Sequence, residues 1–540
     1  MNAITPTGAR PAPGGTLEPF RRRAFTVLWI ATLLGSIGTF MRDIASQWIV
    51  TGLSAQPTAV ALIQAAAVMP VFLLAIPAGV LSDIFDKRRL LIGTQIALLA
   101  VTAALGVIVA LDAMTVSALA LLTFLGGIFA ALSMPAWQAI VPDLVPRDEL
   151  KDAVALNSLG FNVARAVGPA LGGVVLAVAG ATVTYGFDVV SYLVVIGALV
   201  WWRRPLRAAD DIGEHFGGAL RAGVRYAAAS GDMHRLLWRT ALVLAFGSAV
   251  WALLPLVARE ELHGGPAFYG LLLASIGVGA VAAAFVMPRV RDRVGQDGLV
   301  LGATLLLAAA VAALALTGSQ ALAIAATFAL GAAWIATVVT LNSAIQTILP
   351  DWVRGRGLAI YLTVFNGALA GGSLAWGVVA EAIGIAPTLL ASAVSLALVA
   401  PATYRARLPR GDRDLTPSHH WHEPETVQPV ADDRGPVTVI VAYTVSAKNR
   451  PAFLAVATHL GEARRRSGAS AWTVAEDTAA PERILEIFVI PTWAEHRRQH
   501  NRVSHADADL QAAAERLHEG EHPPAVTHLV SLRMHGPAFR

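Results

Sequence analysis

Long apolar runs recur along the first three quarters of the chain and constrain its fold more than any other feature. Each is about 17–25 residues long, enough to cross a hydrocarbon core of about 30 Å as a helix. The charged residues gather in the joins between the runs, whereas the buried core helices of a soluble protein would not produce such a succession. We predict twelve transmembrane helices, at 25–51, 58–82, 89–111, 114–141, 154–179, 184–202, 236–258, 267–288, 298–317, 320–349, 356–380 and 386–404.

Composition agrees with a membrane protein. Only 14% of the 540 residues are charged, against about 25% in soluble domains. The absence of cysteine excludes disulfides, thiolate metal sites, iron–sulfur clusters and a cysteine nucleophile. The chain has no Gly-rich phosphate loop of the Walker type and no Gly-x-Ser-x-Gly nucleophile elbow, which disfavours ATP-driven transport and serine-hydrolase chemistry. The net charge of +4 is too small to indicate nucleic acid, and we expect no such partner.

Lysine and arginine are distributed unevenly between the two sets of joins. The opposite joins hold only Arg259, and the positive-inside rule therefore places both termini in the cytoplasm. The basic residues of the joins on the N-terminal side are Arg21–Arg23, Lys87–Arg89, Arg147, Lys151, Arg203, Arg204, Arg207, Arg221, Arg225, Arg235, Arg239, Arg289, Arg291, Arg293, Arg354 and Arg356.

A short pattern appears twice, once in each half of the apolar region. The segment Gln138–Val145 has the form Gln-x-Ile-x-Pro-Asp-x-Val, and the same form returns at Gln346–Val353. Each copy ends the fourth helix of its half. Two six-helix halves related by a parallel repeat are the arrangement of major facilitator transporters.

The last quarter of the chain changes character. Strands are expected at Val437–Val445, Ala471–Glu476, Arg483–Ile490 and Val526–Leu532, with helices at 448–466 and Trp493–His518. This β-α-β-β-α-β order is ferredoxin-like. The fold class is therefore an all-α membrane protein with a C-terminal α+β domain. Its expected parts are a cytoplasmic segment 1–24, a half 25–202, an inter-half loop 203–235, a second half 236–404, a linker 405–436 and a soluble domain 437–540.

The join after the second run resembles the signature loop of the major facilitator superfamily. It holds Gly79 and Asp83, followed by the basic group Lys87, Arg88 and Arg89. In that family the glycine allows close helix packing and the acid engages a helix end and basic partners, forming a cytoplasmic gate. This chain departs from the pattern at Ile84 and Asp86. A fragment recurs in the second half, with Asp292 and Arg293.

The fifth run is similar to a motif of proton-coupled exporters in the same superfamily. Gly168 and Pro169 are followed by Gly172 and Gly173, residues that bend a helix and permit tight packing. The arginine that these exporters carry in the fourth helix has no counterpart, because 114–141 contains no Arg or Lys.

Longer stretches resemble one branch of this superfamily. The runs Ile76–Asp83, Pro142–Leu150 and Gly168–Gly173 are similar to the enterobactin-exporter branch, and Trp493–Val503 resembles the tail of transmembrane secretion effector transporters. The resemblance implies a secondary exporter of a small organic molecule, siderophore-like or drug-like, working by proton antiport without a cofactor. A tail with monooxygenase-like activity, or one that self-associates or binds a regulatory protein, is the alternative.

Ionisable side chains cost free energy to place inside a membrane, so those within the runs are candidates for function. Asp43 and Asp188 are the carboxylates well inside a run, and we expect one of them, Asp43 first, to couple proton movement. Arg42 should not share the helix face of Asp43 and could snorkel to the outer interface. Arg165 lies deep enough to need a partner or an anionic substrate. Candidates for a central cavity are Arg42, Gln47, Gln64, Asn157, Arg165, Asn342, Gln346 and Asn366.

Histidines gather outside the runs. His419, His420 and His422 in the linker lack a fourth ligand and an ordered scaffold, and we assign no metal site there. In the tail, His496 and His500 stand one helical turn apart and are suited to binding either a metal or a partner surface.

Overall fold

The computed structural model describes residues 17–146, 148–202, 216–409, 413–418, 420, 421 and 426–532. The linker residues His419 and His422 therefore lie outside the described residues. The chain forms two compact units. The first comprises Met1–Asp211, Arg239–Thr340 and Leu362–Arg407, and the second comprises Ile212–Trp238, Leu341–Tyr361 and Leu408–Arg540.

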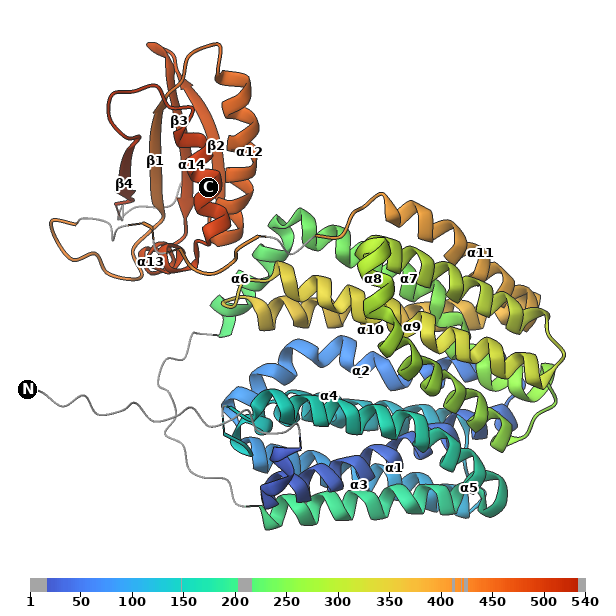
Figure 1. Cartoon of the computed structure of the whole chain (residues 1–540). Coiled ribbons are helices and arrows are strands. Elements are labelled where there is room, and N and C mark those ends of the chain that lie inside the picture. Colours follow the sequence, from blue (N-terminus) through green and yellow to red (C-terminus); the bar gives the residue numbers. More distant parts are fainter. Residues whose placement is uncertain are drawn as a thin grey trace, which may run out of the picture. The chain divides into compact units, whose positions relative to one another are not determined.

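Helices account for nearly all of the region before residue 405 (Figure 1). Among the described residues, ten helices are long and apolar enough to cross a membrane. The short 3-10 helices η1 (Glu18–Arg21) and η2 (Val141–Asp143) and the π-helix η3 (Val257–Glu261) adjoin them. The helices are α1 Arg23–Leu53, α2 Pro57–Ile84, α3 Lys87–Ala110, α4 Val116–Ile140, α5 Leu150–Trp201, α6 Phe216–Ala229, α7 Gly231–Leu256, α8 Pro266–Leu316, α9 Gln320–Ile348, α10 Arg354–Ile383 and α11 Ile385–Tyr404.

Two of these helices, α5 and α8, each contain a sharp turn. They have 52 and 51 residues, about twice the length needed to span a bilayer. The turns lie at Gly180 (φ 78°, ψ 176°) and Gly295 (φ 73°, ψ 176°), in a backbone region that is essentially restricted to glycine. Gly384 separates α10 from α11 in nearly the same conformation. One glycine thus reverses the chain where a loop would otherwise be needed.

The turn at Gly295 corrects one prediction. The fragment Arg291–Gly295 was expected in a join after the eighth span, but α8 remains helical through residue 294. Because a single glycine makes the reversal, no separate loop is required. The predicted repeat is matched by the helix ends, since α4 ends at Ile140 and α9 at Ile348, each within its copy of the pattern.

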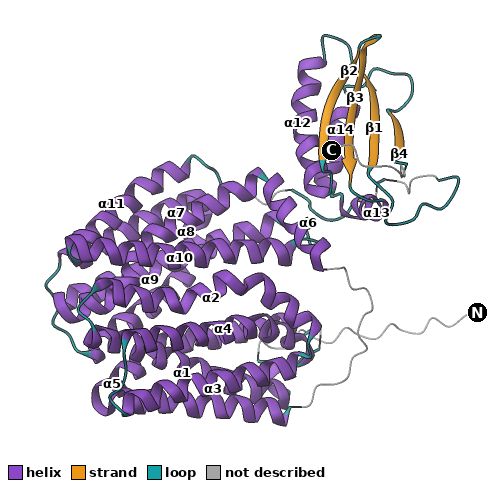
Figure 2. Ribbon diagram, turned by 180° about the vertical axis from the view of Figure 1, so that it is seen from behind, coloured by secondary structure: helices purple, strands orange, loops and turns teal. Residues whose placement is uncertain are grey.

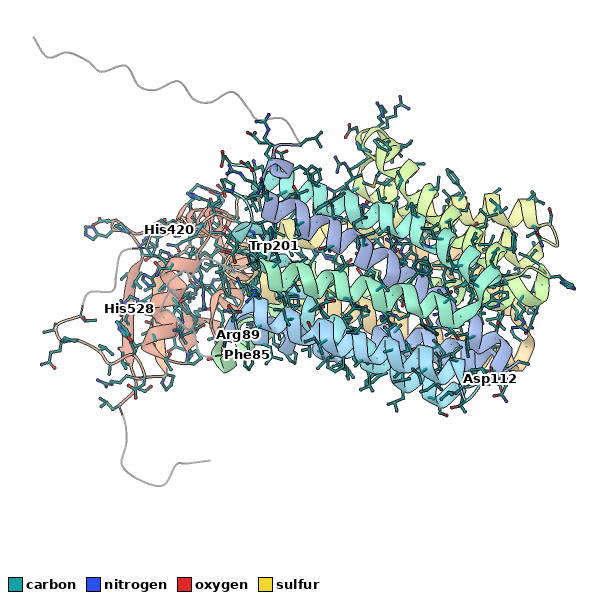
Figure 3. All side chains as sticks on the ribbon, turned by 90° about the horizontal axis from the view of Figure 1, so that it is seen from below. Phe85, Arg89, Asp112, Trp201, His420 and His528 are labelled. Carbon is teal, nitrogen blue, oxygen red and sulfur yellow. The ribbon has the colours of Figure 1, made fainter. Side chains whose placement is uncertain are left out.

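The helices of the first half run antiparallel along one another. In Figure 3, Phe85, Arg89 and Trp201 lie at one end of the bundle and Asp112 lies at the other. We call the Asp112 end the distal end; α1 ends there at Leu53 and α2 begins there at Pro57. The apolar core is built from Ile44, Leu105 and Tyr185 of the first half together with Leu253 and Trp334 of the second.

The C-terminal part folds as one antiparallel sheet with helices (Figure 2). Its core forms because β1 alternates, burying Val437, Val439, Val441 and Tyr443. The strands lie in the order β2-β3-β1-β4. They are β1 Val437–Thr444, β2 Ala471–Asp477, β3 Ala480–Ile490 and β4 Ala525–Val530, and the helices are α12 Arg450–Ser467, α13 Trp493–Arg502 and α14 His505–Glu515.

The prediction of a single helix over Trp493–His518 is wrong, because the helix is interrupted between α13 and α14. Ser504 begins α14 with a capping box, in which its hydroxyl accepts from the Asp507 amide and the Asp507 carboxylate accepts from the Ser504 amide. The cap satisfies amides that a helix start leaves unpaired. The Ser-x-x-Asp signal was visible in the sequence.

Candidate functional site

A buried charge pair joins α1 to the second part of α5. Arg42 Nη1 lies 3.5 Å from Asp188 Oδ2 and donates to the Tyr192 hydroxyl at 2.9 Å. The Asp188 side chain is fully buried and that of Arg42 is only 14% exposed. Burying a charge is expensive unless it is paired and hydrogen-bonded, so this cluster needs its partners to exist within the bundle.

Further hydrogen bonds support Asp188. Its carboxylate accepts from Thr102 of α3 and from Ser191 of α5, each at 3.2 Å. The close approach of α1 depends on Gly38, because a Cβ there would lie 2.8 Å from Asp188 Oδ1. The site is therefore built from three helices, and Thr102, Ser191 and Tyr192 are members that the sequence analysis missed. Their only signal was polarity within apolar runs.

Arg42 corrects two expectations. It was expected to turn away from Asp43, yet Arg42 Nη2 donates to Asp43 Oδ1 at 2.9 Å. Consecutive Cβ atoms do diverge, but the long guanidinium arm reaches back along the helix to its neighbour. It was also considered able to snorkel outward, and instead it is held inside by Asp188 and Tyr192. Asp43 itself is 52% exposed, unlike Asp188.

Arg165 lies half-buried in the first part of α5. Among the residues that the structure describes, no hydrogen bond or ion pair to its guanidinium is found. The backbone beside it packs tightly, since a Cβ on Gly277 of α8 would lie 2.9 Å from Ala166 Cα. A helix-bound cation without a protein partner is suited to receive an anionic ligand.

The glycine motif of α5 packs closely against α1 and α8. A Cβ added at Gly168 or Gly172 would approach α1 within 2.7 Å of Phe40 Cβ or 2.8 Å of Met41 Cα. At Gly173 it would lie 2.8 Å from Gly270 Cα of α8, in the second half. Pro169 contributes its carbonyl to the same crossing. These small residues bring three helices into backbone contact.

Other contacts between the two halves also lie at the distal end. Thr58 donates to Glu381 at 2.5 Å, Arg259 donates to Thr51 at 2.9 Å, and a Cβ at Gly377 would lie 2.5 Å from Ala61 Cβ. Together with the Gly173–Gly270 crossing, they hold the halves closed at this end.

The signature loop has a different role for each basic residue. Arg88 donates to the Leu199 and Val200 carbonyls at the end of α5, both at 2.8 Å, and Lys87 Nζ lies 3.4 Å from the Ala139 carbonyl. The Arg89 amide donates to Asp86, the N-cap of α3. The Arg88 and Lys87 contacts satisfy carbonyls at helix ends, and the Asp86 cap satisfies an amide at the start of α3.

The two signature residues of α2 are Gly79 and Asp83. A Cβ at Gly79 would meet no described atom within 4 Å, so the close helix packing that the resemblance implied is not found there. Asp83 belongs to the last turn of α2, and its side chain lies outside the described residues.

The matching fragment of the second half, Asp292 and Arg293, is exposed on α8. The nearby Asp297 forms an ion pair instead. Arg239 of α7, only 1% exposed, donates to Asp297 at 2.6 Å. Arg239 Nε and Nη2 are buried and have no hydrogen-bond partner within the described parts of the chain. Arg239 was expected only as a cytoplasmic charge, and Asp297 carried no sequence signal that marked it as its partner.

Three of the remaining cavity candidates make described hydrogen bonds. Gln47 donates to Gln64 at 2.7 Å, linking α1 and α2. Asn366 donates to the Leu362 carbonyl of its own helix. Asn157 is half-buried in α5, and the other two candidates, Asn342 and Gln346, belong to the second compact unit.

Comparison with known sequences finds transporters. The chain is 25% identical to the staphyloferrin A transporter of Staphylococcus aureus over 66% of this chain and 90% of that protein. It is 23% identical to the multidrug efflux pump Tap of Mycolicibacterium fortuitum over 70% of this chain and 94% of that protein. It is 28% identical to the enterobactin exporter EntS of Escherichia coli over 52% of this chain and 66% of that protein.

Solved structures agree on the fold. The nucleoside transporter NupG (D323A mutant) matches with a TM-score of 0.60 at 12% identity, covering 71% of this chain and all of that one. A bacterial homologue of the lysosomal transporter Spinster, inward-facing and occupied, matches with a TM-score of 0.57 at 16% identity, covering 72% of this chain and 97% of that one. The sequence profile of the transmembrane secretion effectors matches residues 14–535. The chain therefore belongs to the transmembrane secretion effector family of major facilitator transporters.

Proposed function

We propose that this chain exports a small organic anion, siderophore-like or drug-like, across the bacterial inner membrane in exchange for protons. The observation that carries the proposal is the buried pair Arg42–Asp188, held at 3.5 Å within the first half. A buried carboxylate that faces an arginine has two charge states with different partners, which is what a coupling site requires.

The exchange follows from the chemistry of the pair. When Asp188 is ionised it holds Arg42, and when it takes up a proton it no longer attracts the guanidinium. Arg42 is then left to its other neighbour, Asp43. A substrate whose hydrogen-bond donors bind the ionised carboxylates competes with the proton for Asp188 and Asp43, and such mutually exclusive binding is what exchange requires. Asp188 is our first choice for the coupling acid because it is buried, and Asp43, which the sequence favoured, becomes the second.

An anionic substrate is favoured by the cations in the first half. Arg165 has no hydrogen-bond or ion-pair partner among the described residues and is a second cation suited to the same ligand. The relatives named for staphyloferrin A and enterobactin support the siderophore class, and the multidrug pump supports the drug class.

The architecture we propose has twelve spans with both termini in the cytoplasm. Ten helices are long enough to span, and the turns at Gly180 and Gly295 divide α5 and α8 into two spans each. The excess of basic residues at the end opposite Asp112 supports the orientation. The distal contacts between the halves would then close the periplasmic side, as in an inward-facing transporter.

The signature loop is proposed as the cytoplasmic gate. Arg88 holds the end of α5 through two carbonyls, and Lys87 lies beside the end of α4. Asp83 would complete the gate, and Arg239–Asp297 would serve the second half.

The tail is proposed to have a ferredoxin-like fold and to regulate transport. The order β2-β3-β1-β4 with α12 between β1 and β2 supports that fold. Within the second compact unit, Glu495 of α13 accepts from Arg225 of α6 at 2.7 Å, and Arg502 lies over the Trp352 ring at 4.3 Å. These contacts favour a regulatory role over a free enzyme, and assays of the full chain with quinols or haem would detect a monooxygenase.

The test compares intracellular and secreted small molecules, by mass spectrometry, between a deletion strain and its complemented parent in iron-poor medium. The proposal predicts a compound retained inside only in the deletion strain, and an iron-binding compound would establish the siderophore class. Uptake of that compound by everted vesicles with an imposed proton gradient then tests the coupling. Export that persists when the gradient is collapsed would overturn proton antiport without affecting the assignment as an exporter.

A further inference from the structure

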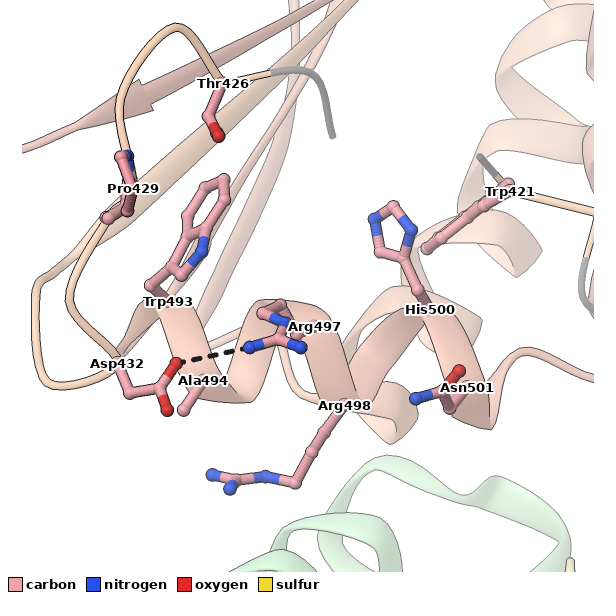
Figure 4. A pocket seen from close by; sticks show the side chains of 11 residues that line it. Trp421, Thr426, Pro429, Asp432, Trp493, Ala494, Arg497, Arg498, His500 and Asn501 are labelled. Carbon is pink, nitrogen blue, oxygen red and sulfur yellow. Dashed lines mark ion pairs between the residues drawn. The ribbon is translucent and has the colours of Figure 1, made fainter. Parts of the chain in front are cut away.

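Three histidines of the tail converge on one point. His496 and His500 lie one turn apart on α13, and His528 lies on β4, the strand paired with β1. One ring nitrogen from each lies within 4.8 Å of the others. The ring of His496 is central, with centroids 4.8 Å from His500 and 4.9 Å from His528. Figure 3 labels His528, and Figure 4 labels His500.

His496 has unmet hydrogen-bonding capacity. It is only 1% exposed, and within the described part of the chain neither of its ring nitrogens has a hydrogen-bond partner. Buried polar groups in native proteins are nearly always paired, so this side chain requires an explanation. A metal ion bound to one nitrogen provides it.

The neighbouring side chain of Gln499 offers a hydrogen-bond acceptor to the second ring nitrogen of His496. Gln499 Oε1 is also buried without a hydrogen-bond partner among the described residues. Gln499 lies close enough to act on the pKa of His496, although no hydrogen bond between them meets ordinary geometry. Metal-bound histidines commonly donate their other N–H to such an acceptor, which fixes the ring.

Access to the cluster comes from the side of His500. This residue lines a cavity of about 500 Å³, together with Trp421, Asp432, Arg497 and Arg498 (Figure 4). The Trp421 ring packs 5.0 Å from the His500 ring. An ion and its fourth ligand can therefore enter from solvent.

We propose that His496, His500 and His528 bind one divalent transition-metal ion such as Zn²⁺, with water or a ligand from the cavity in the fourth position. Three imidazoles suit Zn²⁺, whereas Mg²⁺ and Ca²⁺ require oxygen ligands. Tetrahedral ligands at about 2.0–2.1 Å from zinc lie roughly 3.4 Å apart, so the widest pair has to close by little more than one ångström. This site does not depend on the proposed transport.

The test uses the full chain, purified in detergent through a tag without histidine. Zn²⁺ is titrated calorimetrically, and Co²⁺ serves as a second probe whose visible absorption reports tetrahedral coordination. We expect one ion per chain, retained on desalting, and a tetrahedral Co²⁺ spectrum. Absence of stoichiometric binding by both ions would overturn the site.

Variants locate the ion. His500→Gln and His528→Gln should each weaken Zn²⁺ binding by more than the ~10-fold that loss of an outer-shell partner costs. His459→Gln, at an exposed position on α12, should bind as the parent does. Zn²⁺ should also raise the melting temperature of the parent and not of His528→Gln. If both cluster variants bind Zn²⁺ like the parent, the ion lies elsewhere and the proposal fails.

Discussion

Arg42 of α1 and Asp188 of α5 form an ion pair at 3.5 Å inside the first half, with the Asp188 side chain fully buried. The pair links two helices that are distant in sequence, and Tyr192 and Thr102 complete its hydrogen bonds. The proposed coupling role rests on this arrangement.

Asp188→Asn should abolish export against a gradient while leaving downhill exchange of substrate. The amide keeps the size of the carboxylate and much of its hydrogen bonding, but it cannot alternate between charged and neutral states. Asp43→Asn, at a position 52% exposed, is the matched control and should retain more coupled export. Everted vesicles with and without a proton gradient measure both activities. Uphill export by Asp188→Asn would move the coupling role to Asp43 or elsewhere.

Arg165→Gln should raise KM for an anionic substrate by about 10–100-fold, since a charge-assisted hydrogen bond contributes about 1.5–3 kcal/mol. Arg165→Lys keeps the charge and should recover part of the affinity. Concentration dependence of transport in vesicles checks this. An unchanged KM in Arg165→Gln would show that this arginine does not bind substrate.

Gly173→Ala should destabilise the protein by about 1–3 kcal/mol, the usual cost of overpacking. The new methyl would lie 2.8 Å from both Gly270 Cα and the Pro266 carbonyl, where backbone cannot easily move. Gly186→Ala is the control on the same helix, because its Cβ would meet nothing within 4 Å. Thermal unfolding in detergent compares the two. Equal melting temperatures would contradict the close crossing.

Asp297→Asn should destabilise the second half by about 3–5 kcal/mol, because it removes the partner of a buried arginine. Arg239 is 1% exposed and would lose its ion pair. Asp292→Asn, exposed on the same helix, should have little effect. Thermal unfolding of both variants provides the comparison, and similar melting temperatures would argue against a structural role for Arg239–Asp297.

Glu495 should make the tail sensitive to acid. Its burial alone would raise its pKa, but Arg502, Arg498 and Arg225 outweigh that effect and lower the pKa from an ordinary 4.5 to about 2. The ionised carboxylate therefore stabilises the fold fully above pH 4.5, and this contribution is lost as the pH falls toward 2.

Glu495→Gln measures that contribution. It should lower the melting temperature at pH 7 and reduce its further fall on acidification to pH 3. Glu482→Gln, at an exposed position on β3, should follow the parent at both pH values. Parallel pH profiles for the parent and Glu495→Gln would contradict the assigned role.

The sequence by itself determined the membrane-length helices, the repeat and the strands of the tail, but not α6 or the break between α13 and α14. Apolar runs of membrane length and the β-branched run Val437–Thr444 are local signals, because desolvated backbone must form its hydrogen bonds within regular elements. The glycine motif of α5 likewise predicted tight packing without naming its partner.

Only the tertiary structure decided which charges meet. Asp188 forms an ion pair with Arg42, and Arg239 forms one with Asp297 rather than with Asp292. His528, on a separate strand, lies beside His496 and His500. Periodicity places a residue on its own element, whereas these partners depend on which elements pack together and how far a long side chain reaches. That information resides in long-range packing, so no local pattern could have supplied it.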